Sequence, residues 1–274
     1  MLRDLLVHVD GSEAGRRRTR FAADLASRTG ARLSGLHVTP PPTPPPRYKP
    51  SALAKVAQGI AARLAEDARA AAAIFLEETA GRAIETAWRE GAGDIVPGIV
   101  ASARYADLVI LGQYEWQEPP EYHPLPVAHL VALRCGRPVL VAPHETQACV
   151  LGKVGLAWDG SREAVRAIHE ALPLLRLSSS VQILTVVGPG AFEDADDLAC
   201  VAAHLTRHGV KVFSDPQVIR TPDENRVLRQ KIEEGQYDLL VMGAYRHPAW
   251  MQFFMGGATR SILLTSKIPM LVSH

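Results

Sequence analysis

An internal repeat is the feature that most constrains the fold of this 274-residue chain. The segment 5–12, LLVHVDGS, is echoed by 154–161, VGLAWDGS, at an offset of 149. Two later matches, ADLVILGQY with YDLLVMGAY and RPVLV with IPMLV, share an offset of 131, so the first copy is 18 residues longer in its middle. Part of the excess is the segment Pro40–Pro50, which holds seven prolines in eleven residues. The chain is therefore two copies of one domain, 1–145 and 150–274, each of ordinary domain size.

Each copy alternates strands and helices. In the first copy, buried apolar runs predict strands, and amphipathic or Ala-rich stretches predict helices between them. The expected strands are 5–9, 33–38, 84–88, 107–111 and 138–141, and the expected helices are 13–29, 51–79, 94–105 and 127–135. Ser12 is suited to cap the first helix and Gly30 to end it. The second copy repeats this order of elements.

The alternation predicts an α/β fold. Five strands joined by helical crossovers form an open, doubly wound parallel sheet in each copy, with right-handed connections. Ligands of such sheets bind beyond the carboxyl ends of the strands, at the point where the strand order reverses. Asp10, Gly112, Asp159 and Gly243 fall at those ends. The short apolar strands 139–141 and 270–272 are expected to pair with each other, because an exposed strand edge is a liability.

The richest candidate site lies in the second copy. After the strand that ends at Gly243, the pair Gly256-Gly257 opens the last helix. Paired glycines at a helix N-terminus let backbone amides approach an anion closely, and the helix dipole favours its negative charge. Thr259 adds a hydroxyl and Arg260 a guanidinium group suited to phosphate. The alternative is that the two glycines only form a tight turn.

An Asp-Gly-Ser sequence after the first strand and a glycine-containing loop before the last helix resemble the universal stress protein family, twice over. ATP-binding members carry Gly, two residues, Gly, nine residues, then Gly and Ser or Thr. Gly243 matches the first glycine and Gly256 the third. Arg246 stands in place of the second glycine, and Gly257 in place of the hydroxyl residue.

The resemblance also implies ligand positions and a pairing of the copies. Asp159 would lie at the ribose, and Val187 would end the strand beside the adenine. The implied ligand is ATP or a related adenine nucleotide, with Mg²⁺ as its companion ion. Because single-domain relatives commonly pair through the last strand, the two copies are expected to pack as a pseudo-dimer, and a homodimer is allowed as well.

The first copy has lost this loop. At the positions of Gly256 and Gly257 it carries Leu125 and Pro126, which bring bulk and remove an amide donor. One hypothesis is that the proline segment lies across the former ligand crevice of the first copy and closes it. The alternative is that the segment is a solvent-exposed loop. The run Arg16-Arg17-Arg18 is interpreted as the solvent face of the first helix.

Composition excludes several classes of partner. The net charge is +1, so neither nucleic acid nor an anionic membrane is expected to bind. No apolar run reaches the ~18 residues of a membrane span. Three cysteines without a CxxC spacing favour neither a disulfide framework nor a zinc site, and indicate the cytosol. We interpret none of the ten histidines as part of a pair spaced along the sequence like metal ligands, so no metal ligand is expected.

The favoured hypothesis is a cytosolic stress-response module that binds a nucleotide or similar phosphate ligand in its second copy and signals through an unknown protein partner. Two alternatives remain. One is a scaffold or small-molecule carrier that binds no nucleotide, which Arg246 and Gly257 favour. The other is a slow ATPase, although the sequence offers no P-loop lysine, general base or carboxylate pair and therefore no catalytic residue.

Overall fold

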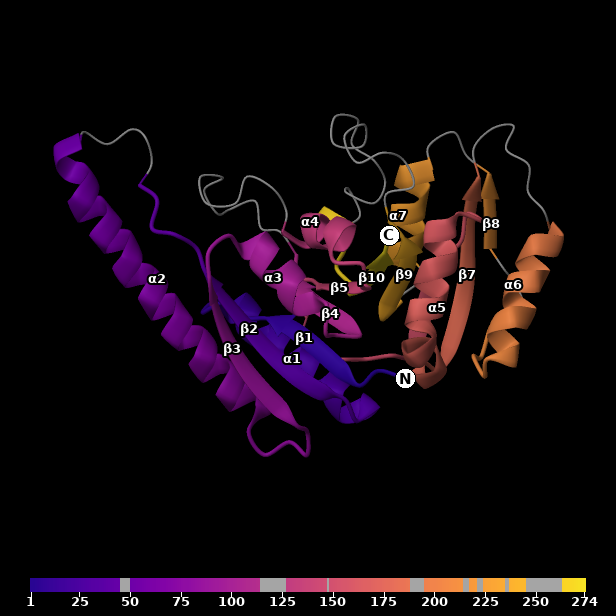
Figure 1. Cartoon of the computed structure of the whole chain (residues 1–274). Coiled ribbons are helices and arrows are strands. Elements are labelled where there is room, and N and C mark those ends of the chain that lie inside the picture. The colour runs from indigo at the N-terminus through magenta and orange to yellow at the C-terminus, as the bar shows by residue number, and fades with distance from the viewer. Residues whose placement is uncertain are drawn as a thin grey trace. The chain divides into compact units, whose positions relative to one another are not determined.

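A computed structural model describes residues 1–44, 50–113, 127–146, 148–187, 195–213, 217–220, 224–234, 237–244 and 263–274. The chain divides into two compact units, Met1–Arg137 with His144–Cys149, and Pro138–Pro143 with Val150–His274. Figure 1 labels their elements. None of the described helices has both the length and the apolar character that a membrane span needs.

The first unit is a parallel sheet with helical connections. Its described strands lie in the order β3-β2-β1-β4, and all three pairings are parallel. The elements are β1 Asp4–His8, α1 Glu13–Thr29, β2 Arg32–Thr39, α2 Pro50–Thr79, β3 Thr86–Ala92, α3 Ile95–Ala103, β4 Leu108–Gly112 and α4 Val127–Arg134. Helix α1 packs on α2, and α3 packs on α4. Right-handed crossovers place these two pairs on opposite faces of the sheet.

The second unit repeats the arrangement and adds one antiparallel strand. Its described strands lie in the order β5-β10-β9-β6-β7-β8, and every pairing except β5 with β10 is parallel. The elements are β5 Val139–Ala142, β6 Lys153–Ala157, α5 Arg162–Leu177, β7 Ser180–Val187, α6 Ala195–Arg207, β8 Gln217–Arg220, α7 Glu224–Glu234, β9 Leu239–Gly243 and β10 Met270–Ser273. The doubly wound α/β fold expected of each copy is confirmed.

Strand β5 comes from the first sequence copy but belongs to the second unit. It pairs with β10 so that Leu140 lies opposite Leu271, Val139 opposite Val272, and Val141 opposite Met270. The repeat offset of 131 makes Leu140 and Leu271 equivalent positions, so the ladder is centred on a residue and its own counterpart. The expectation that the last strands lie side by side is confirmed, and burial of both strands explains why they are apolar throughout.

Two capping residues set the bounds of α1 as the sequence predicted. The Ser12 Oγ accepts a hydrogen bond of 2.9 Å from the Gly15 N–H, which satisfies one of the free amides of the first turn. Gly30 ends the helix at φ 66°, a left-handed conformation that glycine adopts without strain. In the second unit Ser161 caps α5 in the same way, accepting from Ala164 N at 3.1 Å.

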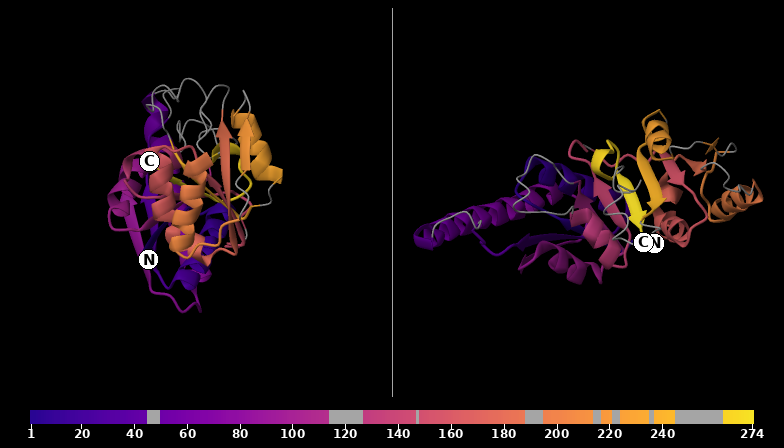
Figure 2. Two further views of the ribbon diagram at one scale, coloured as in Figure 1. Left: turned by 90° about the vertical axis from the view of Figure 1, so that its right-hand side faces the viewer. Right: turned by 90° about the horizontal axis from the view of Figure 1, so that it is seen from above.

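Strand β3 differs from the expectation in length, whereas the long helix α2 is found where it was expected. Strand β3 runs Thr86–Ala92 rather than 84–88, because β2 offers a continuous ladder as far as Thr39 opposite Ala92. The polar residues of this edge strand therefore belong to the sheet, although the sequence has no apolar pattern there that predicts a strand. Helix α2 has 30 residues, and its first turns extend beyond the strands of its unit, as Figures 1 and 2 show.

Candidate functional site

The loop from β6 to α5 places Asp159 at the carboxyl edge of the second sheet. Trp158 N donates to Leu184 O at 2.9 Å, which continues the β6–β7 ladder to the last residue before the loop. The exposed Asp159 then accepts from Ser161 N through Oδ1 at 3.0 Å, a local turn that fixes the entry to α5. Gly160 has φ 69°, and a side chain there would meet nothing within 4 Å. The sequence-predicted Asp159 is therefore exposed, within the described part of the chain, at the carboxyl edge of the sheet.

Gly243 ends β9 beside the first turn of α5. A Cβ on Gly243 would lie 2.5 Å from Ala164 N and 2.7 Å from the carbonyl carbon of Glu163, far inside van der Waals contact. This position needs glycine so that strand and helix can pack closely. Gly243 thus has a structural role, and its place at the strand end puts it beside the loop that continues to Gly256.

Glu163 is a buried carboxylate at the start of α5 that the sequence interpretation passed over. Its side chain is 6% exposed, and its Oε1 accepts from Arg162 Nε at 2.5 Å. Burial alone would raise the pKa of Glu163, but the Arg162 hydrogen bond and charge hold this pKa below its ordinary value. Glu163 consequently keeps its negative charge next to Gly243, where its counterpart in the first copy is Ala14.

Trp158 links this edge to α6. The indole Nε1 donates to Asp197 Oδ2 at 2.7 Å, and Asp197 lies in the first turn of α6. Trp158 itself is buried, and the corresponding residue of the first copy is Val9. The hydrogen bond therefore holds the beginning of α6 over the carboxyl end of β6, one residue before Asp159.

The remaining sequence-predicted residues are only partly described. Val187 ends β7 as expected, and it pairs with Arg220 of β8. The phosphate loop lies outside the described residues, and so does Arg246. The four predicted ligand residues there are Gly256, Gly257, Thr259 and Arg260.

In the first copy the corresponding edge is filled by an arginine. Arg18 of α1 is 6% exposed and donates through Nη2 to Asp10 Oδ2 at 2.6 Å and through Nε to His8 O at 2.7 Å. A Cβ on Gly112 would collide with the Arg18 guanidinium. The interpretation of Arg18 as part of a solvent face is therefore wrong. The helix turns this residue towards the sheet, where the Asp10 carboxylate compensates its charge.

Electrostatics show how closely Asp10 is bound to Arg18. Burial would raise the pKa of Asp10, yet the Arg18 charge and the hydrogen bonds from Ser12 and Arg18 together lower this pKa well below its ordinary value. In the second copy the counterpart of Arg18 is Ala167, which is fully buried and has no charge. Asp10 is thus neutralised within its own unit by an arginine whose counterpart in the second copy is an uncharged alanine.

A second side chain, from helix α2, lies at the carboxyl edge of the first sheet. Asp67 of α2 accepts from Gly11 N at 2.8 Å, and a Cβ on Gly11 would lie 2.5 Å from the same Asp67 oxygen. Its other oxygen lies 3.9 Å from Nε2 of the buried His37, which donates through Nδ1 to Val9 O at 2.9 Å. Side chains of α1 and α2 together fill the region where a ligand of this sheet would bind.

The hypothesis that the proline segment closes the first crevice stays a prediction, because residues 45–49 and 114–126 lie outside the described residues. Of its described prolines, Pro41 and Pro42 are exposed, whereas Pro40 and Pro44 are half-buried. Within the described parts of both units, no three His, Cys, Asp or Glu side chains are arranged to hold a metal ion.

Sequence reasoning missed the roles of five residues at these two edges, and the repeat contained the signal for some of them. They are Arg18, Asp67, Trp158, Glu163 and Asp197. Aligning the copies at the offset of 149 pairs Arg18 with Ala167 and Trp158 with Val9. Such changes of size and charge between equivalent positions mark the places where two copies have diverged in function or packing.

The universal stress protein family model matches residues 1–143 and again 151–274. A universal stress protein from Archaeoglobus fulgidus DSM 4304 has a TM-score of 0.72 and 18% identity, with 98% of this chain and 95% of that chain covered. A functionally unknown protein from Pseudomonas aeruginosa PAO1 has a TM-score of 0.57 and 13% identity, with 99% and 92% covered. None of the curated proteins matches the chain.

The two-fold match of the family model accounts for nearly the whole chain, and the solved structures share its fold over both copies. The Asp-Gly-Ser turn that follows the first strand of each copy lies at the carboxyl edge of its sheet in both units. The chain therefore belongs to the universal stress protein family, as a tandem member with two copies of the family's domain.

Proposed function

We propose that this protein is a stress-response module whose second copy binds a nucleotide or similar phosphate ligand. The ligand would lie beyond the carboxyl ends of β6, β7 and β9, where Asp159, Val187 and Gly243 stand. The loop containing Gly256-Gly257, with Thr259 and Arg260, would hold the phosphates. The ligand class is ATP or a related adenine nucleotide with Mg²⁺, and a protein partner would read the bound state.

One observation carries this proposal, the contrast between the two strand edges. In the first copy the Arg18 guanidinium pairs with the Asp10 carboxylate at the edge, and the Asp67 carboxylate accepts the hydrogen bond of the Gly11 amide. In the second copy Ala167 stands for Arg18, and Asp159 is exposed beside an open Gly160. Among the described residues, the second edge therefore has a small alanine in place of Arg18, and the exposed Asp159 could accept hydrogen bonds from ribose hydroxyls.

Glu163 favours a second candidate function, that of a scaffold or carrier without a nucleotide. Its buried negative charge lies beside Gly243, and a like charge disfavours a nearby phosphate. The ion pair with Arg162 offsets part of this repulsion, because the guanidinium contacts the carboxylate directly. We rank nucleotide binding first, since the Glu163 charge is already paired.

The proposal treats the protein as a binding module of the cytosol. Cys135, Cys149 and Cys200 are all free thiols, which suits a reducing compartment. Slow ATP hydrolysis is the remaining enzyme alternative. It would need a base or metal-held water, and the described residues at the edge supply neither in a catalytic arrangement.

Isothermal titration calorimetry of the full chain with ATP, ADP and AMP tests the proposal, with and without Mg²⁺. We expect one binding site per chain and loss of binding in Gly257→Val, which adds bulk where a phosphate oxygen would approach the backbone. Pro126→Gly changes the equivalent position of the first copy and should leave the binding unchanged. Absence of binding to the wild-type chain would favour the carrier, and equal loss in both variants would refute the assignment to the second copy.

A further inference from the structure

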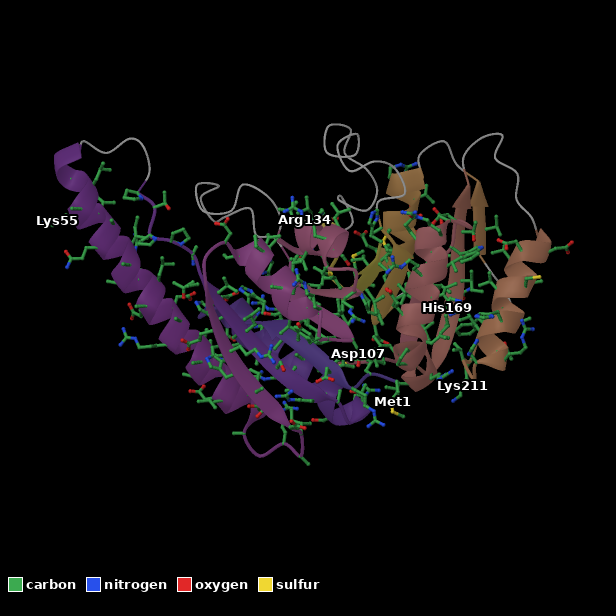
Figure 3. The ribbon with its side chains drawn as sticks, viewed as in Figure 1. Met1, Lys55, Asp107, Arg134, His169 and Lys211 are labelled. Carbon is green, nitrogen blue, oxygen red and sulfur yellow. The ribbon has the colours of Figure 1, made fainter. Side chains whose placement is uncertain are left out.

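Three histidines of the second unit lie together between two helices. His169 comes from α5 and is labelled in Figure 3, His204 comes from α6, and His208 follows the end of α6. The ring centroids of His204 and His208 are 4.6 Å apart, those of His169 and His204 are 5.2 Å apart, and those of His169 and His208 are 6.5 Å apart. We call these three residues the histidine cluster.

The backbone explains why the rings meet. His208 N donates to His204 O at 3.2 Å, so the chain is still helical there and the two side chains, four residues apart, share one face. Arg176, in the last turn of α5, donates through Nε to His208 O at 2.7 Å. The cluster and Arg176 thus join the end of α6 to α5.

The same contacts favour uncharged rings. Arg176 Nη2 lies 3.3 Å from His208 Nδ1, and a guanidinium group can only donate, so this nitrogen accepts and the His208 ring is neutral. Protonation of His208 would remove the acceptor and place a cation against Arg176. The His204 Nε2 is buried and has no hydrogen-bond partner in the described structure, so no group there stabilises a proton on it.

Two cations act on the cluster from the described residues around it. Arg176 contacts it from α5, and Arg207 acts on His204 from α6. Glu170, the acid next to His169, pairs with Arg166 at 3.3 Å, and the salt bridges found in the described part of the chain join no acid to the cluster. Burial and then the charges of His208, His169 and Arg207 lower the pKa of His204 below its ordinary value. These cations also disfavour a metal ion at this place.

We propose that the histidine cluster is an acid-sensitive latch, which holds the end of α6 on α5 at neutral pH and releases it when the rings become protonated. Neutral imidazoles pack against one another without repulsion. Acidification adds positive charges to rings whose centroids are 4.6–6.5 Å apart, beside the two arginines. This repulsion destabilises the contact between α5 and α6, because both helices contribute a ring.

Release of α6 would also affect the carboxyl edge of the second sheet, where Trp158 and Asp159 lie. The other end of α6 is tied to Trp158 through Asp197, one residue before Asp159. A loosened α6 would therefore weaken the Trp158–Asp197 hydrogen bond as well. The latch itself does not depend on nucleotide binding and would operate in a carrier.

The direction of the pH effect follows from linkage. A histidine whose pKa is lower in the folded state is protonated first in the unfolded or released state. Stability of the α6 contact is therefore complete above the ordinary histidine pKa of 6.5 and falls as the pH drops below it, down to the lowered pKa of His204.

Hydrogen exchange of the full chain, followed by mass spectrometry at pH 7.5 and 5.5, tests the latch after correction for the intrinsic pH dependence of exchange. We expect α6 amides near His204 to exchange faster at pH 5.5 than at pH 7.5 once corrected, because the released state takes up protons first. In His169→Gln/His208→Gln the corrected rates should differ less between the two pH values than in the wild type, because His204 then titrates alone. His144→Gln, which changes a histidine of the first unit, should behave as the wild type.

The single variant His169→Gln provides a milder check, because His169 is exposed and its replacement removes one charge without opening a core. NMR titration of the His204 ring should give a pKa below 6.5 in the wild type and a higher pKa in this variant. The proposal is overturned if α6 protection in the wild type is the same at both pH values, or if the pH dependence in the double variant is as large as in the wild type.

Discussion

Arg18 and Asp10 form a 2.6 Å salt bridge at the carboxyl edge of the first sheet, and the second copy has Ala167 and Asp159 at the same two positions. The first copy therefore pairs its carboxylate with an arginine of its own first helix, whereas the second copy has an uncharged alanine at that helix position. The same Asp-Gly-Ser turn thus stands beside a buried cation in one unit and beside a small apolar residue in the other.

Replacing Arg18 should destabilise the first unit. Arg18→Ala leaves the Asp10 carboxylate partly buried without its cation, and the loss of hydrogen bonds to a charged group costs roughly 1.5–3 kcal/mol. Urea denaturation measures the change in the free energy of unfolding. Arg17→Ala is the matched control, because Arg17 is more exposed and pairs with Glu13 at 3.4 Å on the surface, where such pairs contribute at most about 1 kcal/mol. Equal costs in the two variants would contradict the buried role of Arg18.

The Asp10 pair also predicts an acid dependence. The pKa of Asp10 is lowered in the folded chain, so the unfolded chain takes up the proton first once the pH falls below about 3.8. The stabilisation is present above that value and is lost progressively as the pH falls further. In Asp10→Asn the slope of unfolding free energy against pH between 4 and 2.5 should be flatter than in the wild type. An unchanged slope would show that Asp10 does not contribute to it.

Two glycines should respond to alanine in opposite directions. Gly243→Ala places a Cβ 2.5 Å from Ala164 N, and the forced backbone shift should cost about 1–3 kcal/mol. Gly59 lies inside α2, and a Cβ there meets nothing within 4 Å. Gly59→Ala should therefore stabilise the chain by up to about 1 kcal/mol, because alanine favours helix. Thermal unfolding of the two variants checks both signs, and a harmless Gly243→Ala would remove the packing argument.

The cysteines should differ in reactivity towards iodoacetamide. Burial raises the pKa of the Cys149 thiol to about 12, so almost no thiolate is present at pH 8. Cys200 is exposed on α6 and should be alkylated first. Peptide mapping after brief labelling distinguishes the two sites, and rapid modification of Cys149 in the folded chain would show that its burial is incomplete.

The sequence repeat predicted most of the fold because its strands and caps depend on local patterns. Apolar runs marked β1 and β4, and Ser12 and Gly30 set the bounds of α1 through local hydrogen bonds and backbone conformation. The full length of β3 was not predictable in this way. Its polar half belongs to the sheet only because β2 provides partners along its whole length.

The candidate site was predicted less completely, since side-chain direction depends on tertiary contacts. Three consecutive arginines gave no sign that Arg18 alone turns inward, because its partner Asp10 lies on the strand end and not on the helix. The Trp158–Asp197 hydrogen bond spans 39 residues, and nothing local in either segment indicates it. Asp159 and Gly243 were found because strand ends are visible in the sequence.

The β5–β10 ladder has a consequence for how the protein is made. Leu140 emerges from the ribosome 131 residues before Leu271, its partner in the ladder. Pairings of such long sequence separation form late, because the intervening chain must be synthesised and ordered first. Throughout that interval β5 is a strand edge without its partner, the kind of surface that promotes association between nascent chains. Synthesis of this tandem protein is therefore the stage at which its repeated architecture is most vulnerable to mispairing.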